Sequence, residues 1–73
     1  MELPDIEVVA EKVHDNWMKS KLNHGVTSRK SETDEELMVP YDQLSEDAKE
    51  LDRGTVRAVY AAIEELNTRR NNT

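Results

Sequence analysis

The chain has 73 residues, a formal net charge of −6 at neutral pH and no cysteine. A chain of this length forms one small domain, which buries only about 60% of the surface that its unfolded form exposes. The acidic balance argues against binding to a nucleic acid polymer or to an anionic membrane, because both need a basic surface. The absence of cysteine is typical of a reducing compartment. With no apolar run that could cross a bilayer and no recognisable signal peptide, we expect a cytoplasmic protein.

The first predicted element is an amphipathic helix over residues 5–23, with Gly25 as its C-terminal stop. Spacings of three and four residues place an apolar stripe on one face, which consists of Ile6, Val9, Ala10, Val13 and Trp17. His14 and Lys21 flank this stripe. Three acidic residues are expected to face solvent on the other side: Glu7, Glu11 and Asp15.

Residues 24–38 are polar and without periodicity, which predicts a flexible loop. A Pro-Tyr turn at residues 40–41 follows, and Ser45 is a good N-cap for a second helix. This helix is expected to reach about residue 68, either as one rod or as two helices joined near Gly54, and residues 69–73 are expected to fray. The sequence therefore predicts an all-α domain with a core over about residues 5–66. Its two main antiparallel helices are joined by a long loop and the Pro-Tyr turn.

Asp52 is out of place, because helical spacing puts it inside the apolar stripe of the second helix, where an unpaired carboxylate is costly. One interpretation is structural: Asp52 caps a helix or pairs with His14, Lys21 or Arg53. The other is a carboxylate that contacts a ligand between the helices. Trp17 has two similar interpretations, as a core residue or as a flat surface at a pocket mouth that stacks on a ligand ring.

A narrow basic stripe follows the second helix at intervals of four residues, formed by Lys49, Arg53 and Arg57. Interleaved glutamates favour an ordinary solvated helix face, and the alternative is a site for an anion. We find no phosphate-binding loop, no nucleophile motif and no metal-ligand spacing, so we predict a protein that is not an enzyme and has no cofactor or metal.

Taken in order, several motifs resemble the RyR domain, the small helical repeat named after ryanodine receptors and also found in bacterial and phage proteins. The resemblance covers about residues 5–66 and suggests a short stand-alone prokaryotic or phage form. It rests on His14-Asp15-Asn16-Trp17, Lys21, Gly25, Leu37-Met38-Val39-Pro40-Tyr41, Leu44-Ser45-Glu46, Lys49 and Asp52-Arg53. Many members carry an aromatic residue where this chain has Val26, so a stacking site made of two rings would lack one of them.

The resemblance implies a non-catalytic binding or sensing module for a nucleotide-derived or other small anionic ligand. In such a site Trp17 would supply the flat surface, a cationic side chain would lie near the phosphate, and Tyr41 would line the turn. The expected binding residues are Trp17, His14, Lys21, Tyr41, Asp52 and Arg53. The alternative is a protein-interaction or assembly module, such as a homodimer, in which Met18 and Leu22 complete a thin core on a partner.

Overall fold

The computed structural model describes the backbone of residues 2–71 and the side chains of residues 2–68. Two α-helices, α1 (Ile6–Asn23) and α2 (Glu46–Asn71), are separated by a loop and a short 3-10 helix, η1 (Tyr41–Gln43). Within residues 2–71 there is no strand, only an isolated bridge between Lys30 and Glu36. The predicted all-α class is confirmed. No helix in this part of the chain is both long and apolar enough to cross a membrane.

Both ends of α1 are set by local interactions, and its predicted stop at Gly25 is confirmed. The carboxylate of Asp5 accepts the backbone N–H of Glu7, which satisfies one of the donors exposed at a helix start. At the other end Gly25 has φ +78°, a left-handed conformation that costs glycine little. The N–H groups of Gly25 and Val26 then bond to the carbonyls of Leu22 and Lys21, which is a Schellman C-cap.

Helix α2 begins after Ser45, whose hydroxyl accepts the N–H of Ala48 at 3.1 Å. It continues through Gly54 without interruption, which decides between the one-helix and two-helix alternatives. The helical backbone extends beyond residue 68 to Asn71, and residues 72–73 lie outside the described residues. Fraying of the 69–73 tail stays a prediction.

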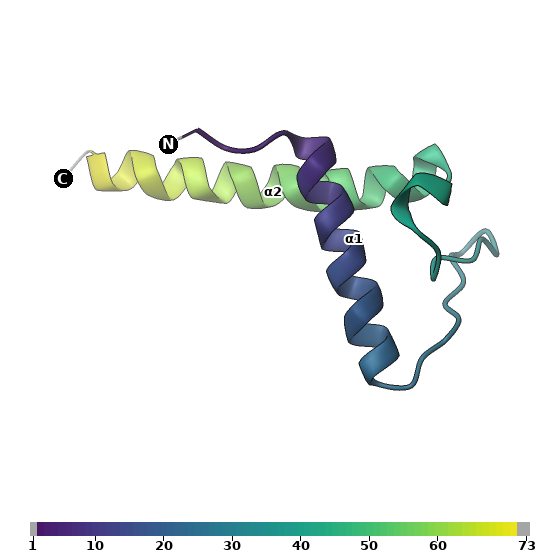
Figure 1. The fold of residues 1–73 in the computed structure, drawn as a ribbon. Helices are drawn as coiled ribbons and strands as arrows, with labels where there is room; N and C mark the ends of the chain where they lie inside the picture. Colours follow the sequence, from purple (N-terminus) through teal and green to yellow (C-terminus); the bar gives the residue numbers. More distant parts are fainter. Residues whose placement is uncertain (1, 72–73) are drawn as a thin grey trace.

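Figure 1 shows α1 crossing the first half of α2 at a steep angle and then running away from it. The two main helices do pack together, but they cross steeply instead of lying side by side, and they touch only near one end of α1. The buried residues at this crossing are Ala10, Tyr41, Leu44, Ala48 and Val56. His14 joins them with 3% exposure, so it is a core residue and not a flank of the stripe. The N-terminal segment lies along the second half of α2, where the Tyr60 hydroxyl donates to the Pro4 carbonyl.

Two glutamates organise the segment between the helices. The Glu36 carboxylate accepts hydrogen bonds from the Ser28 hydroxyl and from the backbone N–H groups of Arg29 and Met38. The Glu35 carboxylate accepts both the N–H and the hydroxyl of Ser45, which ties the segment to the start of α2. The flexibility of residues 24–38 stays a prediction, while these bonds define the conformation that the loop adopts.

Glu7 is exposed, as expected, but it is not ordinary solvated surface. Its carboxylate accepts two hydrogen bonds from the Arg53 guanidinium, at 2.6 and 2.9 Å, and one from the Tyr41 hydroxyl at 3.0 Å. These bonds connect the first turn of α1 to α2 and to η1. Because the partners are 34 and 46 residues away, helical periodicity carries no sign of them.

Candidate functional site

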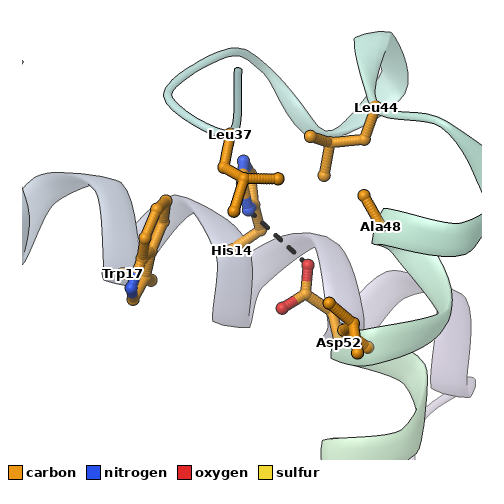
Figure 2. Close-up of a pocket in the computed structure, with 7 residues that line it drawn as sticks. His14, Trp17, Leu37, Leu44, Ala48 and Asp52 are labelled. Carbon is orange, nitrogen blue, oxygen red and sulfur yellow. Dashed lines mark ion pairs between the residues drawn. The ribbon is translucent and has the colours of Figure 1, made fainter. Parts of the chain in front are cut away.

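A pocket of about 210 Å³ opens where α1 and α2 diverge from their crossing. Its walls come from three parts of the chain: α1, the residues on either side of η1, and the first two turns of α2. Figure 2 shows Trp17 at one side, Asp52 and Ala48 at the other, and Leu37 and Leu44 along the connecting segment. The lining residues are His14, Trp17, Leu37, Leu44, Ala48, Leu51 and Asp52. The pocket is therefore mostly apolar with two titratable side chains.

His14 lies at the centre of this pocket and is held from two sides. Its Nε2 is 2.7 Å from the carbonyl oxygen of Val39. A carbonyl can only accept, so Nε2 carries a proton and donates it. Its Nδ1 is 3.5 Å from Oδ2 of Asp52. The imidazole thus connects α1 to the segment before the Pro-Tyr turn and presents its second nitrogen to the carboxylate on α2.

Asp52 is the polar feature that the sequence marked as out of place. Its side chain is 21% exposed and points toward the His14 ring. Burial raises the pKa of Asp52, and a positive charge on His14 would lower it. The structural pairing with His14 considered above is confirmed. The same carboxylate also lines the pocket, so the two interpretations of Asp52 are compatible.

Trp17 is half-buried and forms a side wall of the pocket. Its ring stacks on His14, with centroids 5.6 Å apart and planes 28° from parallel. One helical turn separates the two residues on α1, and this spacing brings aromatic side chains into contact. The indole is therefore neither fully in the core nor free in solvent. It is oriented by the buried imidazole beside it.

Tyr41 and Arg53 lie behind the pocket and do not line it. The Tyr41 ring is buried, 6.1 Å from His14, and its hydroxyl donates to Glu7. Burial and the bond to Glu7 raise the pKa of Tyr41. The Arg53 guanidinium contacts three carboxylates, those of Glu7, Glu46 and Glu50. These hydrogen bonds raise the Arg53 pKa, so its charge is retained but is already neutralised by neighbours.

Lys21, the remaining predicted binding residue, lies one turn beyond Trp17 on α1, outside the pocket. None of the ion pairs found among residues 2–68 involves Lys21. The structure thus brings His14, Trp17 and Asp52 together, places Tyr41 and Arg53 in a supporting cluster with Glu7, and leaves Lys21 at the end of α1. The basic stripe of α2 is engaged in ion pairs, since Lys49 contacts Glu46 and Arg57 contacts Glu50. Only Arg57 lies on a solvated face, because the side chains of Lys49 and Arg53 are 17% and 18% exposed.

Four apolar lining residues were not predicted as part of a site: Leu37, Leu44, Ala48 and Leu51. Ala48 is buried in the core, whereas Leu51 is 68% exposed. Leu37 follows a polar run, and no periodic signal places it against α1. Among residues 2–71 no group of three His, Asp or Glu side chains is arranged to hold a metal ion.

These features define a small two-helix module with an apolar, carboxylate-bearing pocket at the helix crossing. The family model of the RyR domain matches residues 4–70, and the chain belongs to the RyR domain family. The predicted family is thereby confirmed, while a stand-alone prokaryotic or phage origin stays a prediction. No curated protein and no solved structure matches the chain.

Proposed function

We propose that this RyR domain is a non-catalytic binding module whose pocket takes the flat ring of a small, nucleotide-derived ligand. The observation that carries the proposal is a partly buried carboxylate, Asp52, inside an apolar pocket with an indole wall. Such a combination suits a ring that stacks or packs on one side and donates an N–H group at its edge. The proposal assigns no bond-making step to the protein.

The size of the pocket supports a ring and not a whole nucleotide. Its volume of about 210 Å³ is smaller than the 300–1,000 Å³ that is typical of pockets for drug-sized ligands. A sugar and phosphate would therefore extend past Trp17 into the open side. In this direction Lys21 is the nearest predicted cation on α1, whereas Arg53 is engaged by Glu7 and Glu46.

The charge distribution supports the same orientation. A phosphate inside the pocket would face the Asp52 carboxylate, and two negative charges at short range repel each other. An N–H donor on the ligand ring would instead give Asp52 a charge-assisted hydrogen bond, which is stronger than a neutral one. The anionic part of the ligand thus lies outside and the ring edge lies inside.

Calorimetric titration with nucleosides and their mono- and diphosphates tests the proposal, with Trp17 fluorescence recorded in parallel. The chain contains one tryptophan, so its emission reports on the pocket wall directly. We expect heat and a change in emission for the ligands that bind. Neither signal at millimolar ligand, across the whole panel, would exclude the proposed function.

A variant pair locates the binding site. Asp52→Asn keeps the side-chain shape but removes the charge, and we expect affinity to fall by about tenfold or more, since a hydrogen bond to a charged group contributes about 1.5–3 kcal/mol. Asp15→Asn is the matched control, because it makes the same chemical change at an exposed residue of α1 that does not line the pocket. Equal affinity of both variants would place the ligand elsewhere.

A further inference from the structure

A second surface feature lies on α2 and extends from the pocket at the crossing toward the end of the helix. Six residues at helical spacing form an exposed apolar stripe, which we call the α2 stripe: Leu51, Thr55, Ala58, Val59, Ala62 and Leu66. Its three large side chains are 68%, 51% and 57% exposed, for Leu51, Val59 and Leu66 respectively. The side of α2 that packs on α1 and on the N-terminal segment is a different one, formed by Val56, Tyr60 and Ile63.

The α2 stripe contains no charged residue over four helical turns, although 36% of the whole chain is charged. At about 100° per residue, its six members span roughly 100° of the helix surface, which is the width typical of a buried helix face. Thr55, its one polar member, donates its hydroxyl to the Leu51 carbonyl within the helix. Burial of Thr55 would therefore leave no hydrogen-bond donor unsatisfied.

The whole molecule exposes more surface than a compact monomer of its size. Its accessible area is 5607 Å², whereas about 4,600 Å² is expected for a folded monomer of 8.4 kDa. The excess of about 1,000 Å² is comparable with the roughly 800 Å² that each partner buries in a stable protein–protein interface. Beyond the crossing with α1, the second half of α2 extends away from the rest of the molecule, with only the N-terminal segment beside it (Figure 1).

We propose that the α2 stripe binds a second copy of this chain, with the two α2 helices antiparallel around a two-fold axis. An axis that passes between Ala58 and Val59 makes the stripe complementary to itself. Leu51 then lies opposite Leu66 of the second copy, and Thr55 lies opposite Ala62 of the second copy. A two-fold interface requires this self-complementarity, because the same patch serves both partners.

The position of α1 favours the antiparallel arrangement over a parallel one. Helix α1 crosses the first half of α2, and the loop lies beside that same end (Figure 1), so antiparallel pairing places these parts of the two copies at opposite ends. A hollow of about 480 Å³ between the loop and the start of α2 has Leu51 on its wall, next to Leu37 and Ala48. Leu66 of the second copy would reach the edge of this hollow beside Leu51, although polar side chains of the loop form much of its wall.

Sedimentation equilibrium of the full chain, from micromolar to millimolar concentration, tests the proposal. We expect a monomer–dimer equilibrium. Val59→Glu places a charge at the centre of the α2 stripe twice per dimer, and should raise the dissociation constant by at least about tenfold. Val8→Glu is the matched control, because Val8 is 57% exposed on α1, and it should leave the dissociation constant unchanged. A strict monomer at millimolar concentration would overturn the proposal.

Cysteine cross-linking tests the register, since the natural chain has no cysteine. In Thr55→Cys/Ala62→Cys the two thiols of one copy are about 10 Å apart along the helix, too far for a disulfide within the chain. Under mild oxidation we expect the double variant to form covalent dimers and each single variant to stay monomeric. Covalent dimers from the single variants would indicate parallel helices and would overturn the antiparallel arrangement. If Val59→Glu dimerises as strongly as the natural chain, the α2 stripe is excluded as the interface.

Discussion

The imidazole of His14 contacts two other parts of the chain and a neighbour on its own helix. It donates to the Val39 carbonyl, faces the Asp52 carboxylate and stacks on Trp17. At 3% exposure it has little access to water, so each lost partner would leave a buried polar group unsatisfied. A residue expected on the edge of a helix stripe is thus both part of the core and part of the pocket.

Substitution of His14 should destabilise the protein well beyond the average effect of a point mutation. His14→Ala removes the donor to Val39 and the partner of Asp52 and leaves a cavity, which we expect to lower the free energy of unfolding by about 3 kcal/mol. His14→Gln can still donate to the same carbonyl and should recover part of this loss. Chemical denaturation measures the free energy of unfolding of both variants.

The second histidine supplies the control. His24 is exposed at the end of α1 and its ring bonds to the Ser20 carbonyl on the same helix. His24→Ala should change the free energy of unfolding by no more than about 0.5 kcal/mol, as is usual at exposed sites. Similar losses for His14→Ala and His24→Ala would contradict the central role of His14.

At the scale of the elements, each helix boundary depends on residues within a few positions of it. The capping bonds of Asp5 and Ser45 and the left-handed Gly25 are all local. Gly54, in contrast, lies inside α2, where a Cβ atom would meet nothing within 4 Å. The two glycines of the chain therefore have opposite physical roles.

Replacing each glycine by alanine should change the stability of the protein in opposite directions. Gly25→Ala forces a Cβ into a left-handed conformation and should destabilise the protein by about 1 kcal/mol. Gly54→Ala removes backbone freedom from the unfolded chain at a helical position with open space, and should stabilise it by about 0.5–1 kcal/mol. Thermal unfolding of the two variants measures the difference. A stabilising Gly25→Ala would show that the C-cap of α1 does not need a left-handed residue.

This locality explains which elements could be predicted from the sequence. The start of α1, its stop at Gly25 and the N-cap at Ser45 follow from short-range chemistry. The crossing of the helices could not be predicted, because it depends on contacts such as Arg53 with Glu7, which are 46 residues apart. The continuity of α2 through Gly54 was undecided for a similar reason, since propensity favours neither outcome strongly.

The pocket was predictable only in part. Asp52 within an apolar stripe and Trp17 next to a histidine were visible signals, and these residues do lie together. Arg53 was expected to face a ligand because of its charge. Its long side chain turns instead to the nearest carboxylates, and periodicity does not predict that direction.

The whole molecule is extended and is held together by polar bonds between distant segments as well as by a thin core. Its radius of gyration is 15.0 Å, compared with about 11 Å for a compact domain of this length. Glu7 connects α1 to Arg53 on α2, while Glu35 and Glu36 organise the loop. Each of these connections needs an ionised carboxylate.

Stability should therefore fall in acid. The hydrogen bond from Arg53 lowers the Glu7 pKa from 4.5 to about 2, and the Ser28 hydroxyl does the same for Glu36. Because the folded pKa values lie below the unfolded ones, the unfolded chain takes up protons first on acidification. The free energy of unfolding should be at its full value above pH 4.5 and should decline progressively as the pH falls to about 2.

A double-mutant comparison measures how much of the loss of stability in acid comes from the ion pair between Glu7 and Arg53. Glu7→Gln should lower stability at neutral pH and should flatten the pH dependence between 4.5 and 2. In an Arg53→Met background the same Glu7→Gln change should have a much smaller effect on the slope, since the partner is already gone. Denaturant titrations at a series of pH values provide these slopes. An equal effect in both backgrounds would show that Arg53 is not the cause.

Leu51 belongs both to the wall of the pocket and to the α2 stripe. Under the two proposals, a small molecule in the pocket and a second copy on the α2 stripe would contact the same isobutyl group, which would couple their binding free energies. Thermodynamic reciprocity then requires that any effect of the small molecule on self-association be matched by an equal effect of self-association on its affinity. Coupling of this kind would convert the concentration of a small molecule into a change in stoichiometry.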